Sequence, residues 1–529
     1  MNITPVVFVA FEEFDNLGVG YITSVLSESG YESSVIDFRL GKKKILKSLT
    51  EIKPIIVGFS VIFEYHIYEF AELIKYLRKG GIKCHFTAGG QFASLNYEDL
   101  FKIIPSFDSV VRFEGEFTFL ELVTCINNGT DWKNISGIAF KIKDKIIVNP
   151  LRKVITDLDE LPYPMRSPLK KYAFDKKFST ILAGRGCVNN CIFCYLRGYY
   201  QQSSGPIKRI RKPEEVAQEM SQLHMEMGSS VFLFQDDDFP VKPAKNQEWV
   251  KRFCKKLAQR NLDDKILWKI NCRPDEVELN SFSLMKIHGL FLVFLGIEDG
   301  TDEGLTRLNK HMTVEKCLEG ISILKKLEIG FDYGFMLFQP SSTFRSVNDN
   351  LDFLRKLCGD GSTPVTFLKM MPFSGTGIEK ELRNQGRLKG IPGFLDYDFP
   401  DKALNDYYNF IADCLMTWLR DNKGLLNISK WARNYISVFS FYFGKNEEIK
   451  ELSENFIKII SESNLYLINT LKELSALFES GRYSTEKPDA LNNFRIEISQ
   501  KEEYYKRLVN NCIIELMGNF ESQRILQRP

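Results

Sequence analysis

The sequence contains no long apolar run, and this absence limits where the protein can reside. Its longest apolar stretches, such as residues 55–63, fall well short of the roughly 18 residues that a membrane-spanning helix needs. The first residues, MNITPVVFVAFEEF, have no basic leader and are soon followed by acids, which is unlike a secretory signal. We therefore expect a cytoplasmic protein with no membrane partner.

A strong charge of either sign is also missing. The 70 basic and 68 acidic residues give a formal net charge of +2, so no broad basic field is available to gather nucleic acid. The chain has no internal repeat, and its 44% hydrophobic and 26% charged residues are typical of a globular protein. We expect about three domains in 529 residues and no nucleic-acid partner.

Three of the eleven cysteines form the most informative motif. Cys187, Cys191 and Cys194 lie in GRGCVNNCIFC with the spacing C-x3-C-x2-C. Three thiolates on one short loop can bind three irons of a 4Fe-4S cluster and leave the fourth iron open. A structural zinc site needs four ligands, and His224 and Cys254 lack the paired spacing for it. A disulfide cannot use three cysteines, and the remaining cysteines are scattered as expected of reduced thiols.

The cysteine spacing and its glycine-rich lead-in resemble the radical S-adenosylmethionine (SAM) superfamily. In that family the open iron chelates SAM, and an electron from the cluster breaks the S–C5′ bond to give a 5′-deoxyadenosyl radical. The resemblance implies a 4Fe-4S cluster and SAM as cofactors. It also implies an electron donor such as flavodoxin or ferredoxin as a partner.

The N-terminal part alternates between short β-rich runs and amphipathic segments. Strands are expected over residues 6–11, 32–38, 55–60, 84–88 and 109–112. One helix places Phe70, Leu73, Ile74 and Leu77 on one face and is expected to end at Gly80-Gly81. This alternation predicts a doubly wound parallel sheet with its ligand at the carboxyl ends of the strands.

The loops after these strands resemble those of the cobalamin-binding domain that is fused to many radical SAM enzymes. The usual Asp-x-His-x-x-Gly is absent, and Asp15-Asn16-Leu17-Gly18 stands in its place, so no histidine is expected below the cobalt. The lower face is then left to water or to the loop after the third strand. The contacts that the resemblance implies are Asn16, Leu17, Gly18, Ser60, Ile62, Phe63, Glu64, Tyr65, Gly89, Gly90, Glu114 and Gly115. The alternative is a scaffold of tight turns that holds no cofactor.

A second α/β region follows a hairpin near residues 138–148 and a proline-containing strap at residues 157–164. Strands are expected over residues 179–183, 230–234, 266–271, 291–296, 331–337 and 365–370, with a helix that begins at Pro213. Six such units suit the partial (β/α)6 barrel of the superfamily. The functional groups are then expected at the carboxyl ends of the strands.

The strand ends of this barrel supply a predicted SAM pocket. The SAM-binding residues that the resemblance implies are Phe193, Asp236, Asp237, Asp238, Arg273, Gly296 and Glu298. Each has a structural alternative: the aspartates cap the next helix, Arg273 forms a surface ion pair, and Glu298 satisfies a loop. Lys310 and His311 are expected in a solvated loop, and the basic run at residues 208–212 is expected to be an exposed face.

The expected fold class is α/β, with a Rossmann-like cobalamin-binding domain, a partial TIM-type barrel and a mostly helical C-terminal domain. We place these at residues 1–135, 176–390 and 391–529, with a linker strap at 136–175. The aromatic residues beyond Gly390 are expected in its core.

The resemblance implies an enzyme that methylates an unactivated carbon of a small metabolite, natural-product intermediate or peptide. One SAM then methylates the cobalamin, and a second gives the radical that abstracts a substrate hydrogen. A radical rearrangement or cyclisation is the alternative within enzymes, and a cobalamin carrier or sensor is the alternative outside them. A methylthiotransferase is disfavoured because the chain shows neither a basic RNA-binding tail nor a cysteine-bearing N-terminal domain.

Overall fold

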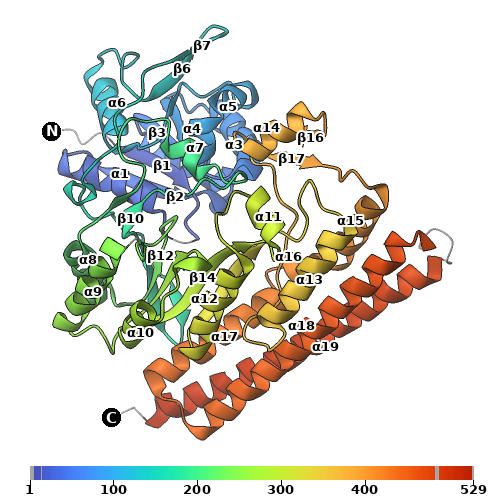
Figure 1. Ribbon diagram of the computed structural model, residues 1–529. Coiled ribbons are helices and arrows are strands. Elements are labelled where there is room, and N and C mark those ends of the chain that lie inside the picture. Colours follow the sequence, from blue (N-terminus) through green and yellow to red (C-terminus); the bar gives the residue numbers. More distant parts are fainter. Residues whose placement is uncertain (1–4, 14, 243, 483–487, 527–529) are drawn as a thin grey trace. The chain divides into compact units, whose positions relative to one another are not determined.

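The computed structural model describes residues 5–13, 15–242, 244–482 and 488–526 (Figure 1). Residues 1–4 and 14, which form part of the segment tested above for a leader, lie outside the described residues. The chain divides into two compact units. The first comprises Met1–Leu169, Ser179–Glu219 and Met371–Tyr397, and the second comprises Lys170–Phe178, Met220–Met370 and Asp398–Pro529. The domain boundaries near residues 135, 175 and 390 stay predictions.

The first unit contains a seven-stranded sheet in the order β2-β1-β3-β4-β5-β6-β7. Its strands are β1 (Val6–Ala10), β2 (Ser33–Asp37), β3 (Ile56–Ser60), β4 (His85–Gly89), β5 (Ser109–Val111), β6 (Ile138–Ile142) and β7 (Lys145–Val148). Neighbours among β1 to β5 run parallel, and β6 and β7 add the expected antiparallel hairpin. The five parallel strands begin and end within one residue of their predicted bounds.

Helices cover both faces of this sheet, which confirms the doubly wound arrangement. Along β1, Val6 and Phe8 face a core shared with α1 (Leu17–Glu28) and α6 (Glu116–Asn128). Val7 and Val9 face the opposite core, which includes α2 (Lys42–Ile52), α3 (Ile67–Lys79) and α5 (Tyr97–Ile103). This alternation is the two-residue period of a strand that is buried on both faces.

The remaining elements of the first unit are short. They are α4 (Gln91–Leu95), β10 (Gly184–Arg185), α7 (Leu196–Tyr200), β11 (Arg209–Ile210), α14 (Gly377–Asn384), β16 (Leu388–Ile391) and β17 (Phe394–Tyr397), with 3₁₀ turns η1 (Phe38–Leu40), η2 (Glu64–His66) and η3 (Leu158–Glu160). β16 and β17 form an antiparallel hairpin that the sequence interpretation did not anticipate.

The second sheet has the order β15-β14-β13-β12-β9-β8. Its strands are β8 (Lys171–Ala173), β9 (Lys176–Ile181), β12 (Ser229–Phe234), β13 (Leu267–Cys272), β14 (Leu290–Glu298) and β15 (Gly330–Phe335). β12 to β15 pair in parallel, as the barrel prediction requires. The helices between the strands are α8 (Pro213–Met227), α9 (Ala244–Gln259), α10 (Leu279–Ile287), α11 (Asp302–Arg307), α12 (Val314–Lys326) and α13 (Phe344–Cys358), with the turn η4 (Pro274–Glu276).

The sixth strand that we expected over residues 365–370 does not form, and this prediction was wrong. One parallel bridge, from Phe338 to Lys369, stands in its place. Side chains from distant parts of the chain take up its donors, because the N–H groups of Val365 and Thr366 donate to Asn464 Oδ1 at 2.8 Å and to the Tyr333 hydroxyl at 3.1 Å. These donors are therefore not available for a strand ladder.

The C-terminal region is helical, as predicted. It contains α15 (Lys402–Cys414), α16 (Met416–Arg420), α17 (Leu425–Phe443), α18 (Glu447–Glu479) and α19 (Pro488–Leu526), and the two long helices α18 and α19 lie side by side (Figure 1). Aromatic packing holds α17 and α19 to the β8–β9 turn, where Phe174 contacts the rings of Tyr435, Phe439 and Phe520. No described helix combines the length and apolar character needed to cross a membrane.

Candidate functional site: a cysteine loop beside a doubly wound sheet

The three cysteines lie on a loop between β10 and α7 in the first unit. Cys187, Cys191 and Cys194 are each half-buried, and the N–H of Cys194 donates to the carbonyl of Cys191 at 3.2 Å, which turns the loop back on itself. Gly186 has φ +90°, and a Cβ there would collide with the carbonyl oxygen of Ile207. Only glycine fits directly before the first cysteine.

The donor set of this loop fits an iron–sulfur cluster. Three soft thiolates suit iron and sulfide, and the side-chain amide of Asn189 donates to Cys187 Sγ at 3.3 Å, the kind of bond that tunes a cluster ligand. The thiolates of such a cluster bind different irons and need not converge on one point. Consistent with this, no described group of three or more His, Cys, Asp or Glu side chains is arranged to hold a single metal ion.

The cysteine loop contacts the Gly89-Gly90 turn of the first sheet. The hydroxyl of Tyr195, next to Cys194, donates to Gln91 Oε1 at 2.5 Å. Gln91 directly follows Gly90 at the start of α4. The structure thus brings together two motifs that the sequence interpretation had treated separately.

The topological switch point of the first sheet lies between β1 and β3, because the chain order reverses there. Two predicted residues meet at this point. Asn16 caps α1 by accepting the N–H of Val19 at 3.2 Å, and its side-chain amide lies 3.5 Å from the hydroxyl of Ser60 at the end of β3. Leu17 is buried against the strap and Gly18 is exposed. Asn16 and Ser60 are therefore placed where a ligand of this fold binds.

The turn after β4 closes against the loop after β3. The N–H of Val61 donates to the carbonyl of Gly89 at 2.8 Å. Gly90 has φ +105° and ψ 178°, a region open to almost no other residue, and a Cβ on it would lie 2.8 Å from the carbonyl oxygen of Val61. Glycine is required at position 90 for the two loops to meet.

In the loop after β3, two aromatic rings are exposed and one carboxyl is buried. Phe63 and Tyr65 stack with centroids 5.3 Å apart and are 48% and 42% exposed. Glu64 between them is buried; burial raises the pKa of its carboxyl, and hydrogen bonds with Ser374 lower it in part. Ile62 is half-buried. Phe63 and Tyr65 are thus the members of this loop that an external ligand can reach.

Glu114 and Gly115 lie after β5, at the start of α6. The carboxylate of Glu114 accepts hydrogen bonds from Arg209 at 2.7 Å, Arg185 at 3.2 Å and the N–H of Ile155 at 2.8 Å. It is engaged by protein groups, and its predicted contact with cobalamin stays a prediction.

Carboxylates follow β12 in the second unit, as the sequence predicts. Asp236 and Asp238 are buried and Asp237 is half-buried. The side-chain amide of Asn271, near the end of β13, donates to the carbonyl of Asp236 at 3.1 Å, so the two strand ends are tied together. Arg273 follows β13 and is also buried; it donates to Asp275 at 2.9 Å and to the carbonyl of Lys310 at 2.5 Å.

Glu298 ends β14 at a bulge, with the strained φ of +75°. Its carboxylate lies against two glycines, since a Cβ on Gly296 or Gly334 would come within 3.1 or 3.2 Å of it. Burial raises the pKa of this carboxyl, whereas Lys310 lowers it. A strained, half-buried carboxyl at a barrel strand end is typical of a functional group.

Lys310 is not the solvated loop residue that we expected, and this prediction was wrong. Its side chain is 4% exposed and lies 3.9 Å from the carboxylate of Glu298, while its ammonium donates to the carbonyl of Gly296 at 2.8 Å. The residues on either side, Asn309 and His311, both have positive φ, which turns Lys310 inward. No pattern in the sequence indicates these dihedral angles. His311 is exposed, as predicted.

The basic run at residues 208–212 is also not an exposed face. Arg209 and Arg211 are each 4% exposed, because carboxylates from other segments pair with them. Arg211 donates to Glu219 at 2.5 Å, and Arg209 donates to Glu114. Within the run, Lys212 is exposed, whereas Lys208 and Ile210 are half-buried. A charge run predicts solvent exposure only where no buried partner exists.

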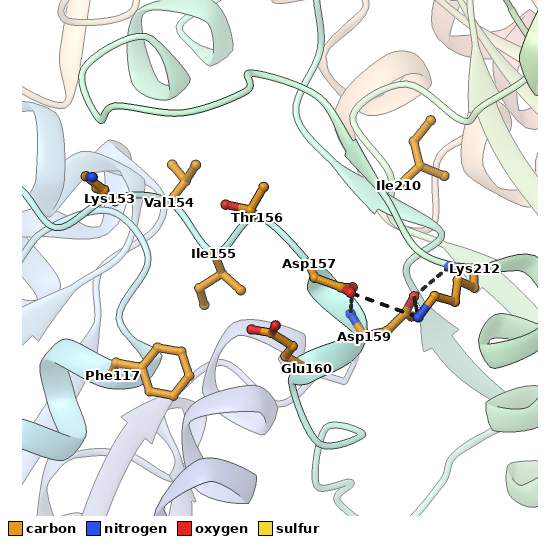
Figure 2. A pocket seen from close by; sticks show the side chains of 10 residues that line it. All are labelled: Phe117, Lys153, Val154, Ile155, Thr156, Asp157, Asp159, Glu160, Ile210 and Lys212. Carbon is orange, nitrogen blue, oxygen red and sulfur yellow. Dashed lines mark hydrogen bonds and ion pairs between the residues drawn. The ribbon is translucent and has the colours of Figure 1, made fainter.

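The strap lines a cavity of about 630 Å³ in the first unit (Figure 2). Three of its charged side chains pair with one another, because Lys212 lies 3.9 Å from Asp157 and 4.0 Å from Asp159. None of the predicted site residues lines it. We assign no ligand to this cavity.

Comparison with known families identifies both halves of the site. Residues 3–123 match the B12 binding domain, and residues 181–354 match the radical SAM superfamily. The first match contains the Asn16, Ser60 and Gly89-Gly90 loops, and the second contains the three cysteines. The chain therefore belongs to the radical SAM enzymes that carry a B12-binding domain. Its cofactors are a 4Fe-4S cluster, SAM and cobalamin.

Individual relatives agree with this class. An uncharacterised methyltransferase of Pyrococcus horikoshii is 28% identical over 370 residues, which are 68% of this chain and 77% of that protein. The anaerobic magnesium-protoporphyrin IX monomethyl ester cyclase of Rubrivivax gelatinosus is 26% identical over 482 residues, 82% of this chain and 84% of that protein. The structure of OxsB, a cobalamin-dependent SAM radical enzyme, has the same fold, with a TM-score of 0.69 at 16% identity over 98% of this chain and 84% of that one.

Proposed function

We propose that the protein is a cobalamin-dependent radical SAM methyltransferase that methylates an unactivated carbon of a small metabolite, natural-product intermediate or peptide. The observation that supports this most directly is the 2.5 Å hydrogen bond from Tyr195 to Gln91. It joins the loop that holds the cluster to the turn that is expected to admit cobalamin. A cluster loop and a cobalamin turn that lie in one compact unit suit methyl transfer to carbon.

In this proposal the chain's own residues bind and orient the cofactors. Cys187, Cys191 and Cys194 hold the cluster, and Phe193 shields it. Asp236–Asp238, Arg273, Gly296 and Glu298 bind SAM, and the loops at Asn16, Ser60, Phe63–Tyr65, Gly89-Gly90 and Glu114-Gly115 hold cobalamin. When bound, cobalamin supplies the methyl group and SAM supplies the radical.

Partners and location form part of the same proposal. Radical SAM enzymes need a reductant, and we propose flavodoxin or ferredoxin for this role. No disulfide joins any of the eleven cysteines, all of which lie in the described residues, and this supports a reducing, cytoplasmic location.

Cyclisation is the second candidate, because the cyclase relative matches 82% of this chain, including part of the region beyond the radical SAM match. The two reactions differ in product mass. Methylation adds one methylene unit, whereas cyclisation adds none.

The test is an anaerobic reaction of the reconstituted protein with cobalamin, dithionite and SAM that carries a deuterated methyl group. A fractionated cell extract serves as the substrate pool, and Cys191→Ala is the matched control. A small molecule or peptide that gains the labelled methyl group, together with 5′-deoxyadenosine, is the expected result. Turnover without label supports cyclisation. Absence of 5′-deoxyadenosine from fully reconstituted protein supports the carrier and rejects both enzymes.

A further inference from the structure

Two glutamates and two arginines form a buried ion cluster beside the cysteine loop. Arg185 donates to Glu116 at 2.7 Å and to Glu114 at 3.2 Å, and Arg209 donates to Glu114 at 2.7 Å. The four side chains are between 2% and 13% exposed. We call these four residues the arginine–glutamate clamp.

The clamp joins segments that are distant in the sequence. Glu116 is the first residue of α6, and Glu114 directly precedes its N-cap, Gly115, in the segment that matches the B12 binding domain. Arg185 lies two residues before Cys187, and it pairs with Arg209 across the β10–β11 ladder. The clamp therefore connects the cobalamin domain directly to the strand that leads into the first cluster ligand.

The clamp also holds the strap. The N–H of Ile155 donates to Glu114 at 2.8 Å, and Arg209 donates to the carbonyl of Ile155 at 2.8 Å. One strap residue is thus bound at both of its backbone polar groups. Three segments of the first unit, namely α6, the β10–β11 ladder and the strap, meet at the carboxylate of Glu114.

The backbone on both sides of the clamp leaves little room for adjustment. Gly184 and Gly186 flank Arg185, and a Cβ on them would collide with the backbone carbonyls of Arg209 and Ile207, respectively. Phe113, directly before Glu114, has φ +65°, which a bulky residue adopts only when its surroundings impose it. A shift of Arg185 would therefore be passed on to Cys187.

A buried ion cluster is a poor way to gain stability. Removing four charges from water is costly, and well-packed apolar side chains often stabilise as much or more. Forked arginine–carboxylate bonds are strongly directional, so their advantage is geometric. The use of charged side chains here indicates that the segments they join must be held in fixed relative positions.

We propose that the arginine–glutamate clamp is a positioning device that fixes the cysteine loop against the cobalamin domain and so sets the electronic contact between the iron–sulfur cluster and cobalt. This role requires the two cofactors and does not depend on methyl transfer. Arg185 touches neither substrate nor cofactor in this proposal; it acts through the strand that carries Cys187.

The test compares Arg185→Lys with Arg152→Lys. Lysine keeps the positive charge of Arg185 but loses the fork that contacts both glutamates. Arg152 is the matched control, because it pairs with Glu121 on the same helix α6 and its side chain is 35% exposed, against 12% for Arg185. Both variants are reconstituted anaerobically with iron, sulfide and hydroxocobalamin, and iron, sulfide and corrinoid content are measured first.

The decisive readouts are spectroscopic. Dithionite first reduces the cobalt(III) of hydroxocobalamin to cob(II)alamin and reduces the cluster by one electron. One electron then passes from the reduced cluster to cob(II)alamin, which becomes cob(I)alamin while the cluster is reoxidised. Stopped-flow absorbance follows the corrinoid, and Cys191→Ala corrects for direct reduction by dithionite. Electron paramagnetic resonance records the reduced cluster with and without SAM.

We expect Arg185→Lys to bind wild-type amounts of both cofactors, to transfer the electron at least about tenfold more slowly, and to show a changed cluster spectrum. Arg152→Lys should match the wild type in every measurement. Equal transfer rates and equal spectra in fully loaded Arg185→Lys and Arg152→Lys would overturn the proposal. If Arg185→Lys fails to assemble the cluster, the isosteric Glu116→Gln takes its place. A fully loaded Glu116→Gln with wild-type rate and spectrum then overturns the proposal in favour of a structural role alone.

Discussion

The close approach of Gly90 to the loop after β3 gives the sharpest single test of the cobalamin site. We consider the substitution Gly90→Ala. The added Cβ would lie 2.8 Å from the carbonyl oxygen and 2.9 Å from the carbonyl carbon of Val61. Both atoms are backbone, so the contact cannot be relieved by rotating a side chain, and the two loops must separate.

A second glycine in the same unit isolates the cost of this contact. Gly41 has φ +80° and ψ 156° and precedes α2, much as Gly90, with φ +105° and ψ 178°, precedes α4. No atom would lie within 4 Å of a Cβ on Gly41. Gly41→Ala therefore carries the dihedral strain alone, and Gly90→Ala carries the strain and the collision.

The two variants are expected to differ in stability and in corrinoid binding. The strain costs roughly 1–3 kcal/mol in either variant, and the collision adds roughly 1–3 kcal/mol for Gly90→Ala, as overpacking does elsewhere. Separation of the loops should also weaken hydroxocobalamin binding at least about tenfold, or ~1.4 kcal/mol. Gly41→Ala should bind hydroxocobalamin like the wild type.

The assay is urea unfolding of the apo-protein followed by circular dichroism, together with titration of hydroxocobalamin followed by absorbance. Equal corrinoid affinity in the two variants would refute the assignment of the Gly89-Gly90 turn to the cobalamin site. Equal free energies of unfolding would refute the steric argument itself.

Three further outcomes follow from particular side chains. Cys191→Ala should lose bound iron and sulfide, whereas Cys125→Ala, a half-buried cysteine on α6, should retain both; iron retained by the first variant would contradict the ligand assignment. Burial lowers the pKa of the His85 imidazole from 6.5 to about 4. Between these two pH values only the unfolded state binds the proton. The free energy of unfolding therefore keeps its full value above this range and decreases as the pH falls through it. At ~1.4 kcal/mol per pKa unit, the loss of unfolding free energy is at most about 3 kcal/mol. Urea unfolding measured from pH 7.5 to 4.5 should show this loss in the wild type, and His85→Gln should remove it. The same pH dependence in both proteins would contradict the prediction. Lys310→Met should destabilise the protein by about 2–3 kcal/mol, because it leaves the half-buried Glu298 carboxyl without its ammonium partner. Adding Glu298→Gln should restore stability but not SAM cleavage, and a double variant that cleaves SAM normally would exclude Glu298 from the SAM site.

The sequence was a good guide wherever the physical signal is local. The five parallel strands of the first sheet could be placed within one residue, since an apolar run on a doubly covered strand and a glycine-rich or polar turn after it are both visible in the chain. The cysteine loop could be identified from spacing alone, because ligands on one short loop must be close in sequence.

The sequence was a poor guide wherever a partner comes from far away. Arg209 was interpreted as exposed because its nearest neighbours are basic, and its carboxylate partner, Glu114, is 95 residues earlier. The strand expected at residues 365–370 failed for the same kind of reason, since Val365 donates to Asn464, 99 residues later. Lys310 lies in the barrel because of the backbone dihedral angles beside it.

The amino-acid sequence by itself determined the class of this protein: a cluster-binding cysteine loop and a doubly wound sheet with a glycine turn at its ligand edge. Those features depend on residue type and on short spacing, and both can be recognised directly in the sequence. Only the tertiary structure decided how the two are joined, through Tyr195 with Gln91 and through Arg185 with Glu114 and Glu116. Contacts of that kind are made by chain segments that meet only after folding, because burial selects partners by position in space and not by position in the sequence.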